Sequence, residues 1–366
     1  MPVDLVLVGA GHAHLAVLAR ANELRAAGVE PVLIAPDTFY YSGLASAVLS
    51  GALPPGRARI DVAALARKTG VVHAASEVVS VDRAARRLTL GDGSVRTYDA
   101  VSFNIGSAVA DPYGWIGRDG VWAVKPLSAL FALERTLEAA FATGGSASAI
   151  VVAGDGPTGF EIAAALTGLH ERHARTVNLT LVGPHGDARW APGRAAKRLI
   201  DGLERRGVSR VTADVVAHGA GKVSLSDGQE LSCDHLVLAT GLKAPALTRT
   251  LGLGLDEVRR IKVAPTLCSV GDDRVFAVGD CATIMGHPRP FAGVFGVRAV
   301  SILIDNLCAL GTGKRLRPYR PQTQWLSILD LGDGTGMAIR GRLWCQGRAA
   351  LSFKRWLDLG FVKSRA

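Results

Sequence analysis

Two glycine-rich segments constrain the fold of this chain more than any other feature. In the first, the apolar run 5–8 ends in Gly9-Ala10-Gly11, and in the second the run 149–153 ends in Gly154-Asp155-Gly156. Each segment lies between a stretch typical of a buried strand and a stretch typical of a helix. The first glycine permits a tight turn, and the second lets backbone N–H groups at a helix N-terminus approach a pyrophosphate. The pair predicts two dinucleotide-binding units.

The two segments differ at their third position. Gly159 completes the second pattern, whereas His14 stands at the corresponding place in the first. The third glycine of this pattern allows close packing of the helix on the strand. The first copy alone is therefore a weak signal, and the second copy makes the pair a strong one.

The two halves of the chain also share their layout. The stretch 98–106, which ends in Gly106, is paralleled by the stretch 233–241, which ends in Gly241. A buried strand over 274–282 then carries Asp280, which indicates a return to the first unit. We predict an α/β fold with two Rossmann-like domains, the second inserted in the first. The predicted boundaries are 1–120 and 242–320 for the first domain, 121–241 for the second, and 321–366 for a C-terminal segment.

The C-terminal segment is expected to form a β-hairpin followed by an amphipathic helix. Two strands are predicted about Gly332-Asp333-Gly334 within 325–345, and the helix over 352–362. Basic residues interleave with an apolar stripe on this helix, which consists of Phe353, Trp356, Leu357, Gly360 and Phe361. Either the stripe packs on the core of the protein, or it attaches the protein to an anionic membrane surface.

Charge and hydropathy exclude several classes of protein. The chain of 366 residues has a net charge of +10, and much of the excess lies in 314–366, but no base-reading or stacking motif accompanies it. We therefore expect no nucleic-acid partner. No run approaches the roughly 18 apolar residues of a membrane-spanning helix, and the N-terminus lacks the features of a signal peptide. We expect a cytoplasmic protein, and leave open peripheral attachment to the inner face of the membrane and a homodimer.

The five cysteines argue against two kinds of site. Cys233, Cys268, Cys281, Cys308 and Cys345 form no C-x-x-C or C-x4-C pair, so neither a dithiol redox motif nor a clustered zinc site is expected. We predict no metal. A catalytic pair that folding brings together from distant positions stays open.

Two stretches near the first glycine segment are candidates for cofactor contact. At the end of the second strand, where an acid usually holds a ribose hydroxyl, the chain has Ala35-Pro36-Asp37. Either Asp37 substitutes from the loop, or adenosine is held mainly by the backbone. The cluster 40–44, Tyr-Tyr-Ser-Gly-Leu, either faces the cofactor or caps the core.

With these motifs in place, the sequence resembles the two-dinucleotide-domain flavoproteins, whose fold is glutathione-reductase-like. This group includes type II NADH dehydrogenases, sulfide:quinone oxidoreductases and ferredoxin reductases. The resemblance rests on the two glycine patterns with Glu161, on Ala-Thr-Gly at 239–241 and on Val-Gly-Asp at 278–280. Further segments are similar to a branch found alone or fused to selenide, water dikinase: Gly-His-Ala-His at 11–14, Tyr-Ser-Gly-Leu at 41–44, Val-Lys-Pro at 124–126, Gly-Val-Phe-Gly-Val-Arg at 293–298 and Leu-Gly-Asp-Gly at 331–334.

The resemblance implies FAD as cofactor and NAD(P)H as substrate. Gly9 and Gly11 would hold the FAD pyrophosphate, and Asp280 would accept hydrogen bonds from the ribityl chain, whose hydroxyls lower the cost of burying a carboxylate. The helix that Gly293 opens would point at the flavin, where negative charge collects on reduction. The cofactor-binding residues that the resemblance implies are Gly9, Gly11, His12, Pro36, Ser42, Gly43, Gly106, Gly154, Gly156, Thr158, Gly159, Gly241, Gly279, Asp280, Gly293 and Val294.

Two residues are expected to act in catalysis. The resemblance places Glu161 near the nicotinamide, in the second domain. Lys125 lies at the predicted domain crossing, where it either approaches the flavin or is simply solvated.

The second domain departs from the usual NAD pattern. Gly183 stands where an acid usually holds the ribose, and His185 and Arg189 follow. With no carboxylate there to repel a 2′-phosphate, we expect NADPH to reduce the flavin at least as well as NADH.

These features together predict an FAD-dependent oxidoreductase. It would take hydride from NAD(P)H and pass electrons to a second acceptor, either a quinone or a small protein. Two alternatives are an enzyme of the sulfide:quinone oxidoreductase type and a non-catalytic flavin-binding accessory or sensor module.

Overall fold

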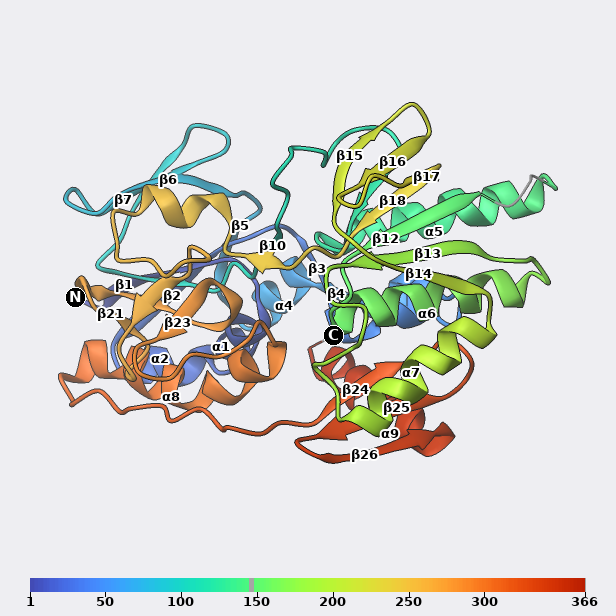
Figure 1. The fold of residues 1–366 in the computed structure, drawn as a ribbon. Helices are drawn as coiled ribbons and strands as arrows, with labels where there is room; N and C mark the ends of the chain where they lie inside the picture. The colour runs from blue at the N-terminus through green and yellow to red at the C-terminus, as the bar shows by residue number, and fades with distance from the viewer. Residues whose placement is uncertain (145–147, 366) are drawn as a thin grey trace.

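A computed structural model describes residues 1–144 and 148–365 and shows two α/β units side by side. In Figure 1 the N-terminal unit lies on the left, the middle of the chain forms the unit on the right, and the chain then returns to the left. The C-terminal segment lies below the second unit. The predicted fold class, with two Rossmann-like domains and the second inserted in the first, is confirmed.

The first unit is built on an eight-stranded sheet that joins distant parts of the chain. Near its centre β9 lies between β1 and β22, with parallel pairing on both sides. Helices α1 (His12–Ala19), α2 (Ala21–Ala26) and α8 (Gly293–Thr312) pack together beside this sheet. The strand order is β23 (Ala282–Ile284), β20 (Ile261–Val263), β21 (Cys268–Ser269), β22 (Asp272–Ala277), β9 (Ala100–Phe103), β1 (Val3–Val8), β2 (Val29–Ile34) and β5 (Val72–Ala74).

The second unit is built on a parallel five-stranded sheet. Its order is β11 (Val121–Ala123), β18 (His235–Leu238), β12 (Ala149–Ala153), β13 (Asn178–Gly183) and β14 (Val208–Thr212). Its helices are α5 (Leu127–Ala142), α6 (Pro157–Arg172) and α7 (Gly193–Arg205). The chain leaves and re-enters the first unit through two short paired strands, β10 (Ala108–Val109) and β19 (Leu242–Lys243). The predicted domain boundaries remain a proposal.

Smaller sheets and helices complete both units. Helix α3 (Ala45–Leu49) extends from the first unit onto α5 and α6 of the second. It follows the 3₁₀ turn η1 (Ser42–Leu44). The other elements of this kind are β3 (Thr38–Tyr40) with β4 (Arg59–Asp61), α4 (Val62–Lys68), β6 (Val78–Asp82) with β7 (Arg87–Leu90) and β8 (Val95–Thr97), and β15 (Val215–Gly219) with β16 (Lys222–Leu225) and β17 (Glu230–Ser232).

The C-terminal segment differs from the predicted hairpin. It has three antiparallel strands, β24 (Ser327–Asp330), β25 (Gly336–Arg340) and β26 (Leu343–Gly347), followed by α9 (Arg348–Lys363). The expectation of two strands was wrong because a turn at Gly341 reverses the chain again with a positive φ of 59°. Helix α9 packs on all three strands and on η1, so this segment touches the first unit as well as the second.

Helix α8 is long and apolar enough to cross a membrane, by length and composition only. The expectation that no segment reaches this length was therefore wrong. In the structure α8 packs against α1, α2 and β2, and Leu303, Ile304 and Leu307 are fully buried. Its apolar face is accordingly part of the core of the first unit.

Candidate functional site: a cavity shared by the two domains

The largest cavity described has a volume of about 670 Å³ and is bounded by both units. The first unit contributes the loop after β1, the end of β2, the turn after β9 and the start of α8. The second unit contributes Thr158, Glu161 and Ile162 from α6, and Lys125 lies where the chain enters that unit. The volume falls in the range of pockets that enclose cofactors, about 300–1,000 Å³.

Most of the residues predicted to contact a cofactor lie in the wall of this cavity. The predicted residues that lie outside this wall are Gly43, Gly154, Gly156, Gly159, Gly241 and Val294. The predicted residues that lie in it are Gly9, Gly11, His12, Pro36, Ser42, Gly106, Lys125, Thr158, Glu161, Gly279, Asp280 and Gly293.

The first glycine segment forms a tight cradle between β1 and α1. Gly9 has a φ of 85°, and a Cβ there would lie 2.7 Å from the carbonyl oxygen of Asn104. A Cβ on Gly11 would lie 2.4 Å from the Oδ1 of Asn104. This Oδ1 accepts hydrogen bonds from the backbone N–H groups of Ala13 and His14 and so caps α1. Only glycine fits at both positions, as a pyrophosphate cradle requires.

His14 occupies the third position of the pattern and is fully buried. Its Nδ1 lies 2.7 Å from the carbonyl oxygen of Gly9, which can only accept, so Nδ1 carries the proton. Its Nε2 lies 2.9 Å from the hydroxyl of Ser102 and accepts from it. Burial lowers the pKa of His14 to about 4, so the ring is neutral and ties the cradle to β9.

Asp280 projects into the cavity after β22, where sequence analysis expected it. Its Oδ2 accepts a hydrogen bond of 2.7 Å from Ser107 Oγ and one of 3.0 Å from Lys125 Nζ. Lys125 Nζ also lies 2.6 Å from Ser107 Oγ. The carboxylate is thus partly buried beside a cation and a hydroxyl, which lowers the cost of its burial. The structure brings Lys125 to the carboxylate of the cavity and does not leave it solvated.

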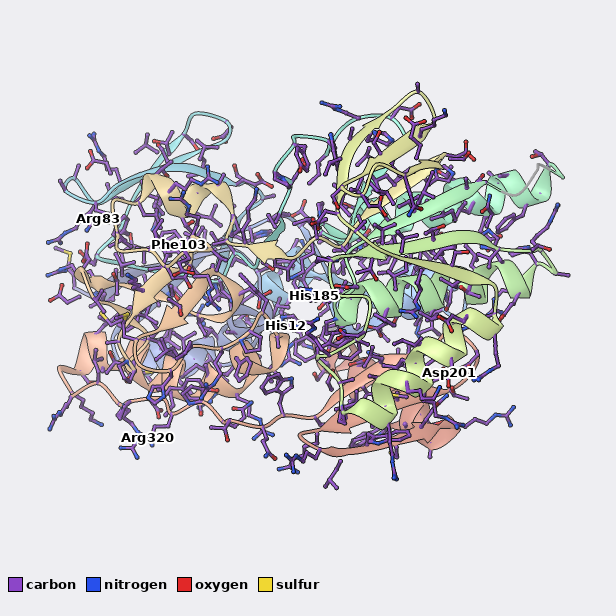
Figure 2. The ribbon with its side chains drawn as sticks, viewed as in Figure 1. His12, Arg83, Phe103, His185, Asp201 and Arg320 are labelled. Carbon is purple, nitrogen blue, oxygen red and sulfur yellow. The ribbon has the colours of Figure 1, made fainter. Side chains whose placement is uncertain are left out.

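Aromatic residues surround His12, which lies in the wall of the cavity. The ring of His12 lies about 5.3 Å from those of Phe39 and Tyr41 and 5.2 Å from that of Phe361 in α9, and the rings of Tyr41 and Phe361 stack. Burial lowers the pKa of His12 to about 4, against the raising effect of Asp280. His12, labelled in Figure 2, is therefore a neutral ring near the meeting point of the two units.

Glu161 extends from α6 into the cavity and is held by two donors. Its Oε1 accepts from Ser46 Oγ at 2.9 Å and from the backbone N–H of Asp330 at 3.0 Å. Burial raises the pKa of the Glu161 carboxyl, and the positive charge of Lys354 opposes this rise. Glu161 therefore combines access to the cavity with a perturbed pKa, as functional carboxyls often do.

Buried charges of α9 form the outer support of this region. Lys354 Nζ donates to the carbonyl oxygen of Gly43 at 2.6 Å and to Asp358 Oδ2 at 2.9 Å, and Tyr41 Oη donates to Asp358 Oδ1 at 3.1 Å. Burial lowers the pKa of Lys354, but the carboxylates of Glu161 and Asp358 outweigh it and the net shift is upward. This pair was not predicted from the sequence, because charged residues on an amphipathic helix usually face solvent.

The second glycine segment has the same backbone design. Gly154 has a φ of 120°, and a Cβ there would lie 2.2 Å from the carbonyl oxygen of Ala239. A Cβ on Gly159 would lie 1.7 Å from the carbonyl oxygen of Gly154. Helix α6 begins directly after Gly156, so its N-terminus faces the loop. The backbone here therefore has the geometry predicted for a second dinucleotide cradle.

A carboxylate lies beside the position where an acid was missing. A Cβ on Gly183 would lie 2.5 Å from both Cβ and Cγ of Asp155. Asp155 Oδ2 accepts from the backbone N–H groups of His185 and Gly186, both at 2.7 Å. The expectation that no carboxylate is present at this end of β13 was therefore wrong, because the glycine loop itself supplies one.

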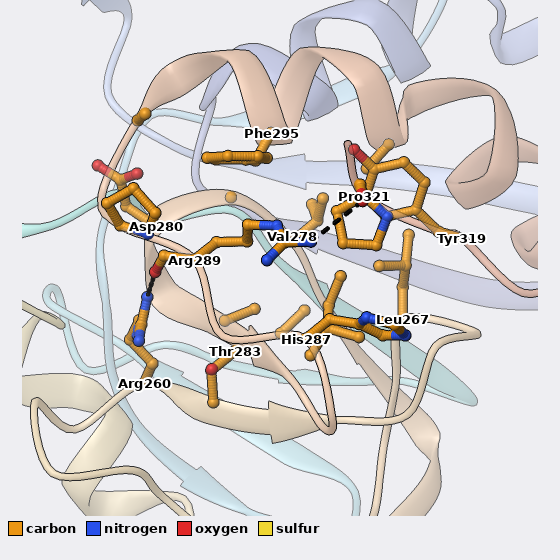
Figure 3. Close-up of a pocket in the computed structure, with 17 residues that line it drawn as sticks. Arg260, Leu267, Val278, Asp280, Thr283, His287, Arg289, Phe295, Tyr319 and Pro321 are labelled. Carbon is orange, nitrogen blue, oxygen red and sulfur yellow. Dashed lines mark hydrogen bonds between the residues drawn. The ribbon is translucent and has the colours of Figure 1, made fainter. Parts of the chain in front are cut away.

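A second cavity, of about 40 Å³, lies on the other side of the Asp280 turn (Figure 3). Arg289 crosses it between Phe295 and His287, donates to the carbonyl oxygen of Pro321 at 3.1 Å and accepts from Arg260 at its own carbonyl. This cavity is too small for a cofactor. Arg289 instead fixes the loop that leads into α8.

The cysteines show no disulfide, and three of the five are buried. Burial raises the pKa of Cys233 and Cys281 to about 12 and that of Cys268 to about 11. A reactive cysteine needs a lowered pKa, so these three thiols are suited to packing.

The fold and the shared cavity define a two-domain, dinucleotide-dependent oxidoreductase. Residues 3–293 match the family described as pyridine nucleotide-disulphide oxidoreductase. The match includes both glycine cradles and Asp280, and the chain belongs to this family. The predicted resemblance and the cofactors FAD and NAD(P)H are thereby confirmed.

Known proteins similar to this chain agree with this assignment. An NADH dehydrogenase-like protein of Mycobacterium tuberculosis is 28% identical over 326 residues, which cover 82% of this chain and 78% of that protein. The sulfide:quinone oxidoreductase of Aquifex aeolicus has a similar structure, with a TM-score of 0.82, 17% identity and coverage of 99% and 91%. NDH2 from Plasmodium falciparum in complex with NADH aligns with a TM-score of 0.84, 12% identity and coverage of 100% and 97%. At these identities the two structures show a shared fold only.

Proposed function

We propose that this protein is a type II NADH dehydrogenase-like enzyme. It takes hydride from NAD(P)H onto FAD and passes the electrons to a quinone. The observation that carries the proposal is the single cavity with walls from both units, in which Gly11 and Asp280 of the first unit and Glu161 of the second line one space. A flavin held by the first unit and a nicotinamide held by the second can meet only in such a shared space.

Each group in the wall has a proposed role. Gly9 and Gly11 bind the pyrophosphate of FAD, and Asp280, fixed by Ser107 and Lys125, binds the ribityl hydroxyls. The N-terminus of α8 at Gly293 stabilises negative charge that develops nearby. The bound flavin supplies the hydride and electron-transfer chemistry, and the protein orients and polarises it.

Glu161 and Lys125 are the proposed catalytic residues. The raised pKa of Glu161 allows its carboxyl to hold a proton next to the cavity, where reduction of a quinone requires protons. Lys125 Nζ provides a positive charge in the same wall, 3.0 Å from Asp280.

Relatives support the choice of donor and acceptor. Besides the M. tuberculosis protein, the type II NADH:quinone oxidoreductase of Haemophilus influenzae is 26% identical over 188 residues, which cover 47% of this chain and 42% of that enzyme. The sulfide:quinone alternative receives less support, since the buried cysteines have raised pKa values.

The outer face of α9 suits a membrane surface, where a quinone would be met. Phe353, Trp356 and Leu357 are 45%, 70% and 43% exposed, and the rings of Phe353 and Trp356 stack. Exposed aromatic and aliphatic side chains flanked by basic residues are typical of interfacial helices. The inner face of the same helix carries Lys354 and Asp358, so α9 both packs on the protein and exposes an apolar stripe.

Anaerobic titration tests the dehydrogenase proposal. We expect addition of NADH or NADPH to the yellow holoprotein to bleach the flavin band near 450 nm, and addition of a soluble quinone to restore it. If the flavin stays oxidised with both nucleotides, the protein is a flavin-binding accessory or sensor module and the proposal fails.

Vesicle sedimentation tests the membrane surface. We expect the Phe353→Ser/Trp356→Ser protein to lose sedimentation with anionic vesicles and to keep its FAD spectrum. Val95→Ser changes an apolar residue of β8 that is 58% exposed and lies far from α9 in the sequence, and it is the control. Equal sedimentation of the α9 variant and the wild type would exclude α9 as the attachment site.

A further inference from the structure

We propose that Asp155 selects the nucleotide of the second site, favouring the 2′-hydroxyl of NADH over the 2′-phosphate of NADPH. This inference rests on the proposed binding of a nicotinamide nucleotide at Gly154-Asp155-Gly156. It opposes the preference expected from the sequence alone. Asp155 lies in the glycine loop after β12, and its side chain packs against Gly183 at the end of β13.

The end of β13 is where this fold places the group that recognises the adenosine ribose. Gly183 occupies the position and has no side chain, and the carboxyl of Asp155 fills the space directly against it, 2.5 Å from where a Cβ would be. Asp155 is 9% exposed, so the surrounding residues hold its carboxylate in one position. The chain therefore presents an acid at the ribose position from the glycine loop instead of from the strand.

The two oxygens of Asp155 have different tasks. Oδ2 accepts the N–H groups of His185 and Gly186, both at 2.7 Å, and fixes the loop after β13. Within residues 1–144 and 148–365, Oδ1 accepts no hydrogen bond from the protein, so this oxygen remains to accept from a ribose hydroxyl. A carboxylate oxygen accepts from a hydroxyl and repels a phosphate.

The backbone donors that an added phosphate would need are already in use. Exposed N–H groups in a loop of this kind bind anions, but those of His185 and Gly186 are bonded to Asp155. His185, labelled in Figure 2, is exposed in this loop. A 2′-phosphate would therefore face the carboxylate of Asp155 at the place where it needs hydrogen-bond donors.

The neighbouring cations are also engaged. Arg189, which follows Gly183 in the sequence, pairs with Asp187 at 3.0 Å. Arg210 pairs with Glu204 at 2.7 Å and donates to the carbonyl oxygen of Gly186. The charge next to the ribose position is therefore set by Asp155.

The test compares nucleotide fragments on the full-length holoprotein. The probes are ADP-ribose and 2′-phospho-ADP-ribose, measured by calorimetry, together with the anaerobic rates of flavin reduction by NADH and NADPH. We expect the wild type to bind ADP-ribose at least tenfold more tightly than its phosphorylated form, and to be reduced faster by NADH in the same proportion.

Asp155→Asn is the decisive variant. The amide oxygen can still accept from His185 and Gly186, so the loop is kept, while the negative charge is removed. We expect the tenfold preference to disappear. Asp227→Asn removes an exposed carboxylate from the turn between β16 and β17 of the second unit and should leave the preference unchanged. Asp155→Ser repeats the test if the asparagine variant is unstable.

The outcomes separate the two proposals. Equal binding of both fragments by the wild type, or an unchanged preference in a folded, yellow Asp155→Asn protein, overturns the role of Asp155. Binding of ADP-ribose with the expected preference but no bleaching by NADH supports Asp155 and refutes the dehydrogenase function. If neither fragment binds, both proposals fail.

Discussion

The two glycine cradles share a backbone path and differ in what fixes it. In each, the first glycine has a positive φ, and a carbonyl after a neighbouring strand, Asn104 O or Ala239 O, leaves no room for a Cβ. In the first cradle, the side chain of Asn104 caps α1. Ala239 has no polar side chain, so it cannot cap α6 in this way. The first cradle is thus preformed by the protein, which suits a resident cofactor, whereas the second leaves more of its helix N-terminus to an exchanging nucleotide.

The third position shows what the glycine pattern requires. Gly159 is needed because a Cβ would lie 1.7 Å from the carbonyl oxygen of Gly154. In the first cradle the corresponding residue, His14, donates to the carbonyl oxygen of Gly9 through its ring. The residue at the third position therefore has to hold the helix firmly against the loop. Direct backbone packing does this in the second cradle, and a buried side chain does it in the first.

The largest expected difference lies between Gly11→Ala and Gly156→Ala. A Cβ on Gly11 would collide with Asn104, whereas a Cβ on Gly156 has no neighbour within 4 Å. We expect the first variant to be purified without FAD, and the second to keep its FAD with stability within about 0.5 kcal/mol of the wild type. Flavin content and urea denaturation measure both. Similar flavin loss in both variants would contradict the comparison.

Gly159→Ala should damage only the second cradle. The added methyl must displace the backbone at Gly154, at a cost of about 1–3 kcal/mol. We expect flavin reduction by NADH to slow at least a hundredfold while the FAD content stays normal. Gly202→Ala, at a helical glycine of α7 with open space around it, is the control. Loss of FAD from Gly159→Ala would show that the two cradles are not independent.

The neutral ring of His14 predicts a pH dependence of the first cradle. The pKa of His14 is lowered from 6.5 to about 4, so the unfolded chain takes up a proton between these values and the folded protein does not. The contribution of His14 to the free energy of unfolding is fully present above pH 6.5 and falls as the pH drops toward 4. At pH 5 the loss from this residue is roughly 2 kcal/mol. Urea denaturation should show a smaller loss between pH 7 and pH 5 in His14→Gln. An equal loss of stability in the wild type and in His14→Gln would exclude His14 as a source of this pH dependence.

Ser102→Ala is expected to have the smallest effect. It removes the donor to His14 Nε2 and should cost about 1 kcal/mol of stability without changing reduction by NADH. Ser80→Ala, on the exposed side of β6, is the control for urea denaturation. A hundredfold change in the rate of reduction would mean that Ser102 also acts on the second site.

Local patterns predicted the fold class, both cradles and the place of Asp280, because glycine turns and buried strands are short-range signals. Contacts between distant segments were not predictable in this way. Asn104 lies within the stretch 98–106, and Asp155 lies between two glycines of the second pattern, but neither pattern indicates what these side chains contact. Lys354 was predicted only as one of the basic residues that interleave with the apolar stripe of its helix, yet it is 9% exposed. Each of these side chains takes its role from a partner far away in the sequence, such as Gly43 for Lys354.

The contact of α9 with His12, which lies in the cavity wall, has a consequence for the order of events during synthesis. The cradle at Gly9 is among the first parts of the chain to leave the ribosome, but β22 must still pair with β9, and Phe361 must still reach His12 and Tyr41. Phe361 belongs to the last part of the chain to be translated. A chain truncated before α9 would therefore leave the ribosome with His12 and Tyr41 lacking their contact with Phe361.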